Sequence, residues 1–474
     1  MRLKIYHLFY FIFQCLPKIS TKVVLFQFNQ LISNDINQFD DKDIPKANDD
    51  DINYYKNLYN NRIYTIINIG NPNQQMMGLF NLDVNIFYIS NQDYCYTTPL
   101  YNYSFAKSES SKIIKKIEGD EYFSDYYIIN DTIKIDLIEN NTKKEQEIQD
   151  IQFEFNYPKR QWGEEDKREK VYCADIGISL NTKRDQPSIF LYQLKQKKII
   201  NSYIITMNYT KNDGGQVYIG GFPHEYMPSL YKEEDLRTTY IVPRQSFSQF
   251  RIIMKNIYIK INETETISIN NNEVYFHLEL NVIVCPTNYF KKIQNLFFKP
   301  YFDSKICQIK NMTQKMTQYN MIICKNDKNF NIKSFPSIYF HHYELNYIFH
   351  LTYEELFQLK NDKFYFLIVH SDFSGSYWKL GKPFLKKYQI TLNLDEKSIN
   401  FYNITLNNHE GEVDTQDDSY IKGDLKSIIL IIVCGVLGVG LVIVSYLFYK
   451  KVKGERKKRA NELKDDEFEY KGIN

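Results

Sequence analysis

Residues Tyr64 to Gln74 read Y-T-I-I-N-I-G-N-P-N-Q, and this stretch decides which fold the sequence predicts. Its first half is rich in β-branched and aromatic side chains, which favour the extended backbone of a strand. Its second half contains Gly, Asn and Pro, which end strands in tight turns. Similar short runs, separated by Asn, Asp and Gly, recur up to residue 402. The sequence therefore predicts an all-β protein over most of its length.

Two further stretches show the same strand pattern, Gln216 to Ile219 and Ile252 to Ile259. Helical periodicity is limited to brief segments, Ser188 to Lys195 and Tyr353 to Leu359. The part of the chain that carries this pattern, about 350 residues, is long enough for two β domains.

The two ends of the chain predict its compartment. A cationic start, Met1 to Lys4, leads into the apolar run Ile5 to Leu16, which is too short for a membrane span and fits a signal peptide. Near the other end, Ser427 to Tyr449 contains no charged residue and is long enough to cross a bilayer. The basic residues that follow it predict a cytosolic tail, and so a single-pass type I membrane protein of the secretory pathway.

The tail ends in Tyr470 to Ile473, Y-K-G-I, which looks like a tyrosine-based sorting signal. Together with the signal peptide it predicts either an endosomal or lysosomal-type compartment or the cell surface. The formal net charge is only +2, and basic residues do not cluster with aromatic ones, so nucleic acid is not an expected partner. Cysteine and histidine spacing predicts neither a metal site nor a cofactor.

The part of the chain expected in the lumen carries sequons and cysteines. The candidate glycosylation sites are Asn102, Asn130, Asn140, Asn208, Asn262, Asn311 and Asn403. Cys307 and Cys324 flank a mostly polar loop and are expected to pair in the oxidising lumen. Closing a loop of roughly 16 residues is worth roughly 3 kcal/mol in the chain-entropy model. Cys95 with Cys173 is a second candidate pair, which leaves Cys285 outside either bridge.

The order of local motifs resembles the pepsin-like aspartic proteases (family A1). Besides the opening stretch, the family's motifs are matched by D-I-G-I-S-L at Asp175 to Leu180, G-G-Q-V-Y-I-G-G at Gly214 to Gly221, Y-I-V-P at Tyr240 to Pro243 followed by Ile257 to Ile259, F-P-S-I-Y-F at Phe335 to Phe340, L-G-K-P-F-L at Leu380 to Leu385, and Asp395 with Ile399 to Phe401. The resemblance implies two β lobes with a substrate cleft between them.

The expected layout follows from the resemblance and the two ends. It comprises a signal peptide at 1–20, a pro-segment or flexible lead-in at 21–53, an N-terminal lobe at 54–238, a C-terminal lobe at 239–405, a stalk at 406–426, a transmembrane helix at 427–449 and a cytosolic tail at 450–474.

The resemblance also implies one catalytic Asp per lobe, each in an Asp-Thr/Ser-Gly turn. Two such carboxyls share one proton and together activate a water. Here the corresponding positions hold Asn81, followed by Leu82 and Asp83, and His277, followed by Leu278 and Glu279. Asn has no titratable proton, and His lacks the second carboxyl that the dyad needs. These six residues are the expected lining of the cleft, and no intact catalytic pair is expected.

Two further features bear on activity. The flap that covers the cleft in the family has tyrosine candidates at Tyr122, Tyr126 and Tyr127, but its Y-G-x-G pattern is missing. Asp83 and Glu279 stand at equivalent places in the two turns, so a shifted carboxylate pair is an alternative dyad.

Three functions remain open from the sequence. The preferred interpretation is a catalytically silent, membrane-anchored protein that binds a peptide or protein ligand in its cleft. The alternatives are an active aspartic-type endopeptidase with altered catalytic residues, and a structural surface glycoprotein.

Overall fold

The computed structural model describes a defined part of the chain. The described ranges are 21–30, 50–52, 54–55, 63–81, 86–90, 103–118, 125–139, 141–157, 174–179, 189–210, 214–242, 250–261, 266–269, 272–278, 280–314, 317–371 and 377–402. Within them, no helix is long and apolar enough to cross a membrane. The expected signal peptide, stalk, span and tail lie outside the described residues.

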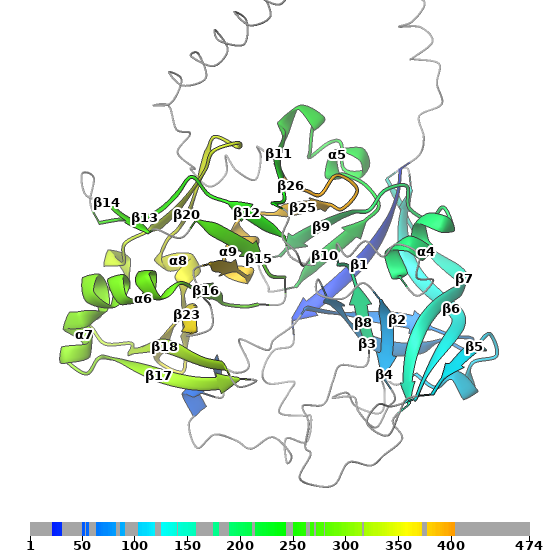
Figure 1. Cartoon of the computed structure of the whole chain (residues 1–474), viewed down its shortest axis with the longest axis horizontal. Helices are drawn as coiled ribbons and strands as arrows, with labels where there is room; N and C mark the ends of the chain where they lie inside the picture. The colour runs from blue at the N-terminus through cyan, green and yellow to red at the C-terminus, as the bar shows by residue number, and fades with distance from the viewer. Residues whose placement is uncertain are drawn as a thin grey trace, which may run out of the picture. The chain divides into compact units, whose positions relative to one another are not determined.

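Thirteen of the described strands form the largest sheet, in the order β11-β26-β25-β9-β10-β1-β2-β3-β8-β4-β7-β6-β5 (Figure 1). Their bounds are β1 Lys22–Gln30, β2 Ile63–Ile69, β3 Gln74–Asn81, β4 Phe87–Ser90, β5 Lys112–Ile117, β6 Asp125–Glu139, β7 Thr142–Tyr157, β8 Ala174–Gly177, β9 Ile204–Tyr209, β10 Gly215–Ile219, β11 Leu236–Tyr240, β25 Ile390–Asn393 and β26 Ser398–Tyr402.

The largest sheet joins strands from the two ends of the described chain. Strand β25 pairs antiparallel with β9, and the hydroxyls of Thr206 and Thr391 on these strands lie 2.9 Å apart. Strand β26 pairs with β11. The expected lobe boundary at 238/239 therefore falls inside β11, within a sheet to which both halves of the chain contribute.

Two smaller sheets belong to the second half of the chain. One has the order β12-β15-β24-β16-β23-β18-β22-β21, with β17 paired to β18, and the other has the order β14-β13-β19-β20. Their bounds are β12 Arg251–Ile253, β13 Asn256–Lys260, β14 Thr266–Ile269, β15 Glu273–Phe276, β16 Ile283–Cys285, β17 Cys307–Gln314, β18 Thr317–Lys325, β19 Ile338–His342, β20 Tyr347–Leu351, β21 Phe357–Lys360, β22 Lys363–Phe366, β23 Ile368–Ser371 and β24 Trp378–Leu380.

The described helices are short. They are η4 Phe105–Lys107, α4 Phe190–Gln196, α5 Pro223–Tyr226, η5 Glu233–Asp235, α6 Thr287–Ile293, η6 Gln294–Phe298, α7 Lys299–Asp303, η7 Ile332–Ser334, α8 Tyr353–Leu356 and α9 Lys382–Lys387. In α4 the buried side chains include Phe190, Leu191 and Leu194, which repeat at helical spacing and pack on the first sheet's core. The residues at 50–52 and 54–55 are also helical.

A hydrophobic core rich in phenylalanine holds the sheets together. In the second half, Phe298 lies among Phe335, Phe357 and Phe366, with ring centroids 5.2 to 6.3 Å away, the spacing of favourable aromatic pairs. Trp378 in β24 is completely buried.

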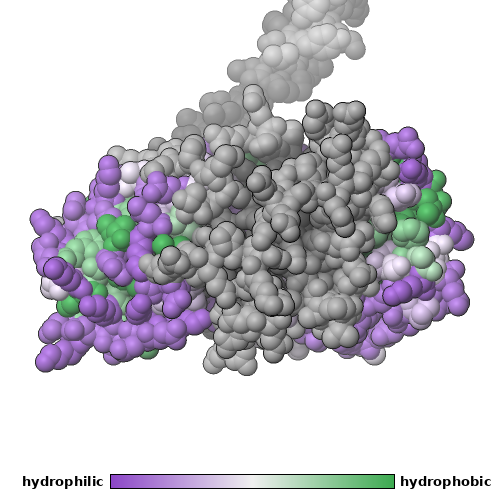
Figure 2. Space-filling model, turned by 90° about the horizontal axis from the view of Figure 1, so that it is seen from below, coloured by the Kyte–Doolittle hydropathy of each residue, from purple (hydrophilic) through white to green (hydrophobic). Residues whose placement is uncertain are grey.

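The part of the described surface visible in Figure 2 is mostly hydrophilic, with smaller hydrophobic areas.

Several expectations differ from the structure. The flexible lead-in expected at 21–53 contains β1, whose buried Val24, Phe26 and Phe28 pack in the core while its backbone pairs with β10, β2 and β6. The strand expected at Ile252 to Ile259 is broken at Met254 into β12 and β13, which join different sheets.

Helical content was also underestimated. The run α6-η6-α7 from Thr287 to Asp303 is helical, because Tyr289, Phe290, Ile293, Phe297 and Phe298 place one buried face at helical spacing. The fold is therefore mostly β rather than all-β.

The Cys307–Cys324 disulfide is present, as predicted. The polar loop expected between the two cysteines is instead the β17–β18 hairpin, in which Cys307 stands directly opposite Cys324. The polar residues that suggested a loop lie mostly on β17 and at the start of β18, whereas Met321 to Cys324 on β18 are all buried.

Replacing both Cys307 and Cys324 by Ser is expected to lower the free energy of unfolding by about 3 kcal/mol, because the unfolded chain regains the entropy of an open loop. Urea unfolding of the variant and the parent measures the difference. A reducing agent should destabilise the parent and leave the variant unchanged. Alkylation of Cys307 in the unreduced parent, seen by peptide mapping, would contradict the bridge.

Candidate functional site

The two halves of the chain contain the same strand arrangement at the predicted site. In the first half, β8 lies between β3 and β4, parallel to β3 and antiparallel to β4, and β4 continues parallel to β7. In the second half, β24 lies between β15 and β16 with the same directions, and β16 continues parallel to β23. The turn after β3 and the turn after β15 are therefore equivalent positions.

Asn81 is the last residue of β3 and is partly buried. It pairs with Gly177 of β8, and the amide of Ile178 donates to the Asn81 carbonyl at 2.9 Å. The backbone of the first turn is thus fixed at its start. Leu82 and Asp83 lie outside the described residues.

His277 takes the equivalent place directly after β15. Its amide donates to the carbonyl of Leu380 at 3.0 Å, and the amide of Leu280 donates back to its carbonyl at 3.5 Å. Burial, with a further contribution from the charge of Lys379, lowers the pKa of His277 to about 3. The imidazole is therefore neutral at any pH above about 4 and is a weak base.

The second turn differs from the expectation at Leu278. Its side chain is 2% exposed and belongs to the hydrophobic core, so it does not line a binding surface. An apolar residue between two polar ones in a tight turn points inward because burial of its side chain is favourable. Glu279 lies outside the described residues, so the shifted pair of Asp83 and Glu279 stays a hypothesis.

Two of the candidate flap tyrosines, Tyr126 and Tyr127, lie on β6. Strands β5 and β6 pair antiparallel, with Tyr126 opposite Ile117 and Tyr127 opposite Lys116. Tyr127 packs against the core beside Phe105, at 6.2 Å between ring centroids, which is a structural role. Tyr122 lies outside the described residues.

Cys285 and His370 form another neighbouring pair, on β16 and β23. Burial raises the pKa of the Cys285 thiol well above its ordinary value, so it is not an activated nucleophile. Among the described residues, no group of three or more His, Cys, Asp or Glu side chains could hold a metal ion.

Three of the seven candidate glycosylation sites lie in the described strands. Asn311 on β17 is exposed, whereas Asn208 on β9 is partly buried and the side-chain oxygen of Asn130 on β6 is buried. Asn311 is therefore the most accessible of the three. Asn102, Asn140, Asn262 and Asn403, like Cys95 and Cys173, lie outside the described residues.

Sequence reasoning missed two buried carboxylates. Asp131 accepts hydrogen bonds from the hydroxyls of Tyr103 and Ser108, at 2.6 and 3.0 Å, behind the turn at Gly70. Asp51 accepts hydrogen bonds from lysines of the second half. Asp in an Asn- and Asp-rich chain gives no local signal of burial, because only distant residues provide the partners.

Comparison with known proteins bears on the fold. No protein-family model and no curated protein matches the chain. A solved structure that is similar is that of conglutin gamma, a unique basic 7S globulin from lupine seeds, with a TM-score of 0.52, 10% sequence identity, and coverage of 81% of this chain and 95% of that one. At this identity the similarity concerns the fold alone. It confirms a mostly β, two-lobed fold of the pepsin type, as the sequence motifs predicted.

Proposed function

We propose that this chain is a catalytically silent, pepsin-fold protein that is anchored in a membrane and acts by binding a peptide or protein ligand. The observation that carries the proposal is the pair of residues at the two equivalent turns, an amide at Asn81 and a neutral imidazole at His277. A carboxyl dyad needs one shared proton, and neither side chain supplies it at neutral or mildly acidic pH.

The chemistry that remains is recognition. A neutral imidazole and an amide each offer a hydrogen-bond donor and an acceptor, which suits the backbone groups of an extended peptide. Loss of the general acid–base catalysis that a carboxyl dyad provides lowers the rate of peptide hydrolysis by about 10²–10⁴-fold. Membrane anchorage is supported by the uncharged stretch from Ser427 to Tyr449 and the basic residues after it.

The test uses the full chain in a mild detergent with a broad peptide library, from acid to neutral pH, with and without pepstatin. We expect peptides to be retained uncut. Pepstatin-sensitive cleavage that is abolished by Asp83→Ala or Glu279→Ala would show instead an enzyme with a shifted dyad. If the peptides are neither cleaved nor retained, the result would favour a structural surface glycoprotein.

A pair of variants sharpens the test. Asn81→Asp with His277→Asp is expected to restore little cleavage, because Asp83 and Glu279 still occupy the third position of each turn, where the family has Gly. Adding Asp83→Gly and Glu279→Gly is expected to increase cleavage. Equal, high activity of the parent and both variants would overturn the proposal.

A further inference from the structure

The helical residues at 50–52 and 54–55 pack against the second half of the chain. The segment precedes β2, which belongs to the first sheet, yet its contacts are with β17, β18 and β22. Asp51 and Tyr55 are four residues apart, so they lie on one face of the helical turn. That face makes the buried hydrogen bonds, while Tyr54 beside it packs its ring 4.4 Å from that of Tyr365 and 4.3 Å from Nζ of Lys360.

Asp51 is held by two cations and a phenol. Its carboxylate is 2.7 Å from Nζ of Lys310 and 2.8 Å from Nζ of Lys363, and the hydroxyl of Tyr365 donates to it at 2.8 Å. The Asp51 side chain is only 5% exposed. Burial alone would raise its pKa, but these partners outweigh burial and lower the pKa to about 2. The site therefore selects an ionised carboxylate.

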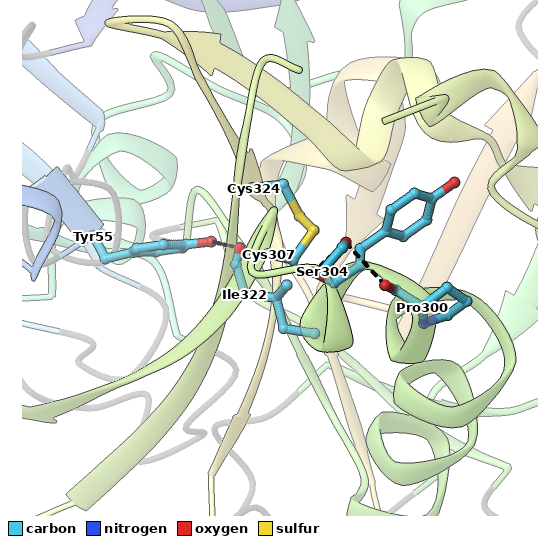
Figure 3. The surroundings of a disulfide bond; sticks show 7 residues. Tyr55, Pro300, Ser304, Cys307, Ile322 and Cys324 are labelled. Carbon is cyan, nitrogen blue, oxygen red and sulfur yellow. Dashed lines mark hydrogen bonds between the residues drawn. A yellow bond between two sulfur atoms is a disulfide. The ribbon is translucent and has the colours of Figure 1, made fainter. Parts of the chain in front are cut away.

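Tyr55 fills the adjoining position and is completely buried. Its hydroxyl donates to the carbonyl of Ile322 at 2.9 Å and to the carbonyl of Phe366 at 2.7 Å. Figure 3 shows the Tyr55 hydroxyl pointing at Ile322, beside the Cys307–Cys324 bridge. A phenylalanine at position 55 would fit the same space but would lose both hydrogen bonds.

The surface under Tyr55 is apolar and belongs to the second half of the chain. Besides Tyr55 itself, this cluster consists of Leu280, Val282, Val284, Met312, Tyr319, Met321, Ile323, Tyr365 and Val369. The disulfide fixes the β17–β18 hairpin, which supplies Lys310, Met321 and the Ile322 carbonyl. Among the described residues, the second half thus provides the lysines, the phenol and the strand carbonyls that hold Asp51 and Tyr55.

We propose that this surface is a recognition site for short peptides in which an aspartate stands four residues ahead of a tyrosine, and that residues 50–55 are its resident ligand. The two determinants are chemically distinct. Lys310, Lys363 and the Tyr365 hydroxyl bind the carboxylate. The carbonyls of Ile322 and Phe366, beside an apolar surface, bind the tyrosine. Such a separation of charged and aromatic determinants defines a peptide motif. The site is separate from the Asn81 and His277 turns and does not depend on the function proposed for them.

The test uses a fluorescein-labelled peptide with the sequence of residues 48–57, N-D-D-D-I-N-Y-Y-K-N, and the full chain in a mild detergent. In the double variant Asp51→Asn with Tyr55→Phe, the resident segment loses its negative charge and the Tyr55 hydroxyl but keeps its volume. Fluorescence anisotropy should then show binding that is about tenfold or more tighter than to the parent, whose tethered segment competes.

Controls separate recognition from packing. Adding Lys310→Ala and Lys363→Ala should weaken peptide binding by about tenfold or more, whereas Lys333→Ala, at an exposed lysine of the same half, should not. A peptide with Asn and Phe in place of Asp51 and Tyr55 should bind weakly. The more disruptive variant Asp51→Ala with Tyr55→Ala should have a lower Tm that the native peptide raises. Absence of binding to both variants, or equal binding of the two peptides, would overturn the proposal.

Discussion

The Gly381→Ala variant is expected to lose about 3 kcal/mol of unfolding free energy, at the upper end of what overpacking costs. A Cβ at this position would lie 2.2 Å from the carbonyl oxygen of Leu280 and 2.4 Å from that of Val282. Both are backbone atoms directly after the His277 turn, so they cannot rotate away. Relief requires a shift of the turn or of α9, and the variant should unfold at a distinctly lower urea concentration.

Gly221→Ala is the matched control for this prediction. A Cβ there would also be too close to its neighbours, but these are side-chain atoms, Oε2 of Glu225 and Cγ2 of Thr21, and not backbone. Moving Glu225 gives up the hydrogen bond from the Phe222 amide, so the loss should be about 1 kcal/mol, smaller than for Gly381→Ala. Equal losses in the two variants would show that the backbone around Leu280 adapts freely, contrary to our expectation.

Stability is expected to fall as the pH drops below about 6.5, because two histidines are neutral in the folded protein. Burial lowers the pKa of His342 to about 4 and that of His277 to about 3. In the unfolded chain both protonate near pH 6.5. The stabilisation is therefore complete above pH 6.5 and is lost as the pH falls towards the folded values. At pH 5 the loss from His342 is about 2 kcal/mol.

The contribution of His277 has the same sign, but we assign it no magnitude, because the residue as a whole is partly exposed to solvent. Urea unfolding between pH 7 and pH 4 measures the slope, and His342→Gln should flatten it. Asp51→Asn should leave this slope unchanged, because the depressed pKa of Asp51 matters only as the pH falls from 3.8 towards 2. A slope unaffected by His342→Gln would contradict the assignment.

Local sequence predicts the strands that pair with near neighbours. Tyr64 to Ile69 and Gln216 to Ile219 become β2 and β10, because β-branched and aromatic residues favour strands wherever a partner is available. The order of pepsin-type motifs predicts the fold. The helical run from Thr287 to Asp303 was missed, because its aromatic residues are also typical of strands.

The sequence predicts where the candidate site lies in the chain, but it does not predict which residues surround the site. Motif spacing places Asn81 and His277 at equivalent turns, as the strand pairing shows. The neutral state of His277 depends on burial by residues distant in the sequence, and so does the binding of Asp51 by Lys310 and Lys363. Sequence spacing carries no information on such long-range partners.

The pairing of β25 and β26 with β9 and β11 has a consequence for synthesis of the protein. Residues 390–402 emerge from the ribosome long after residues 204–240. Until then the nascent chain carries open strand edges at β9 and β11, which are prone to pair with other chains. Truncation before residue 390 should therefore give an aggregating product, whereas a chain released after residue 402 can close its largest sheet.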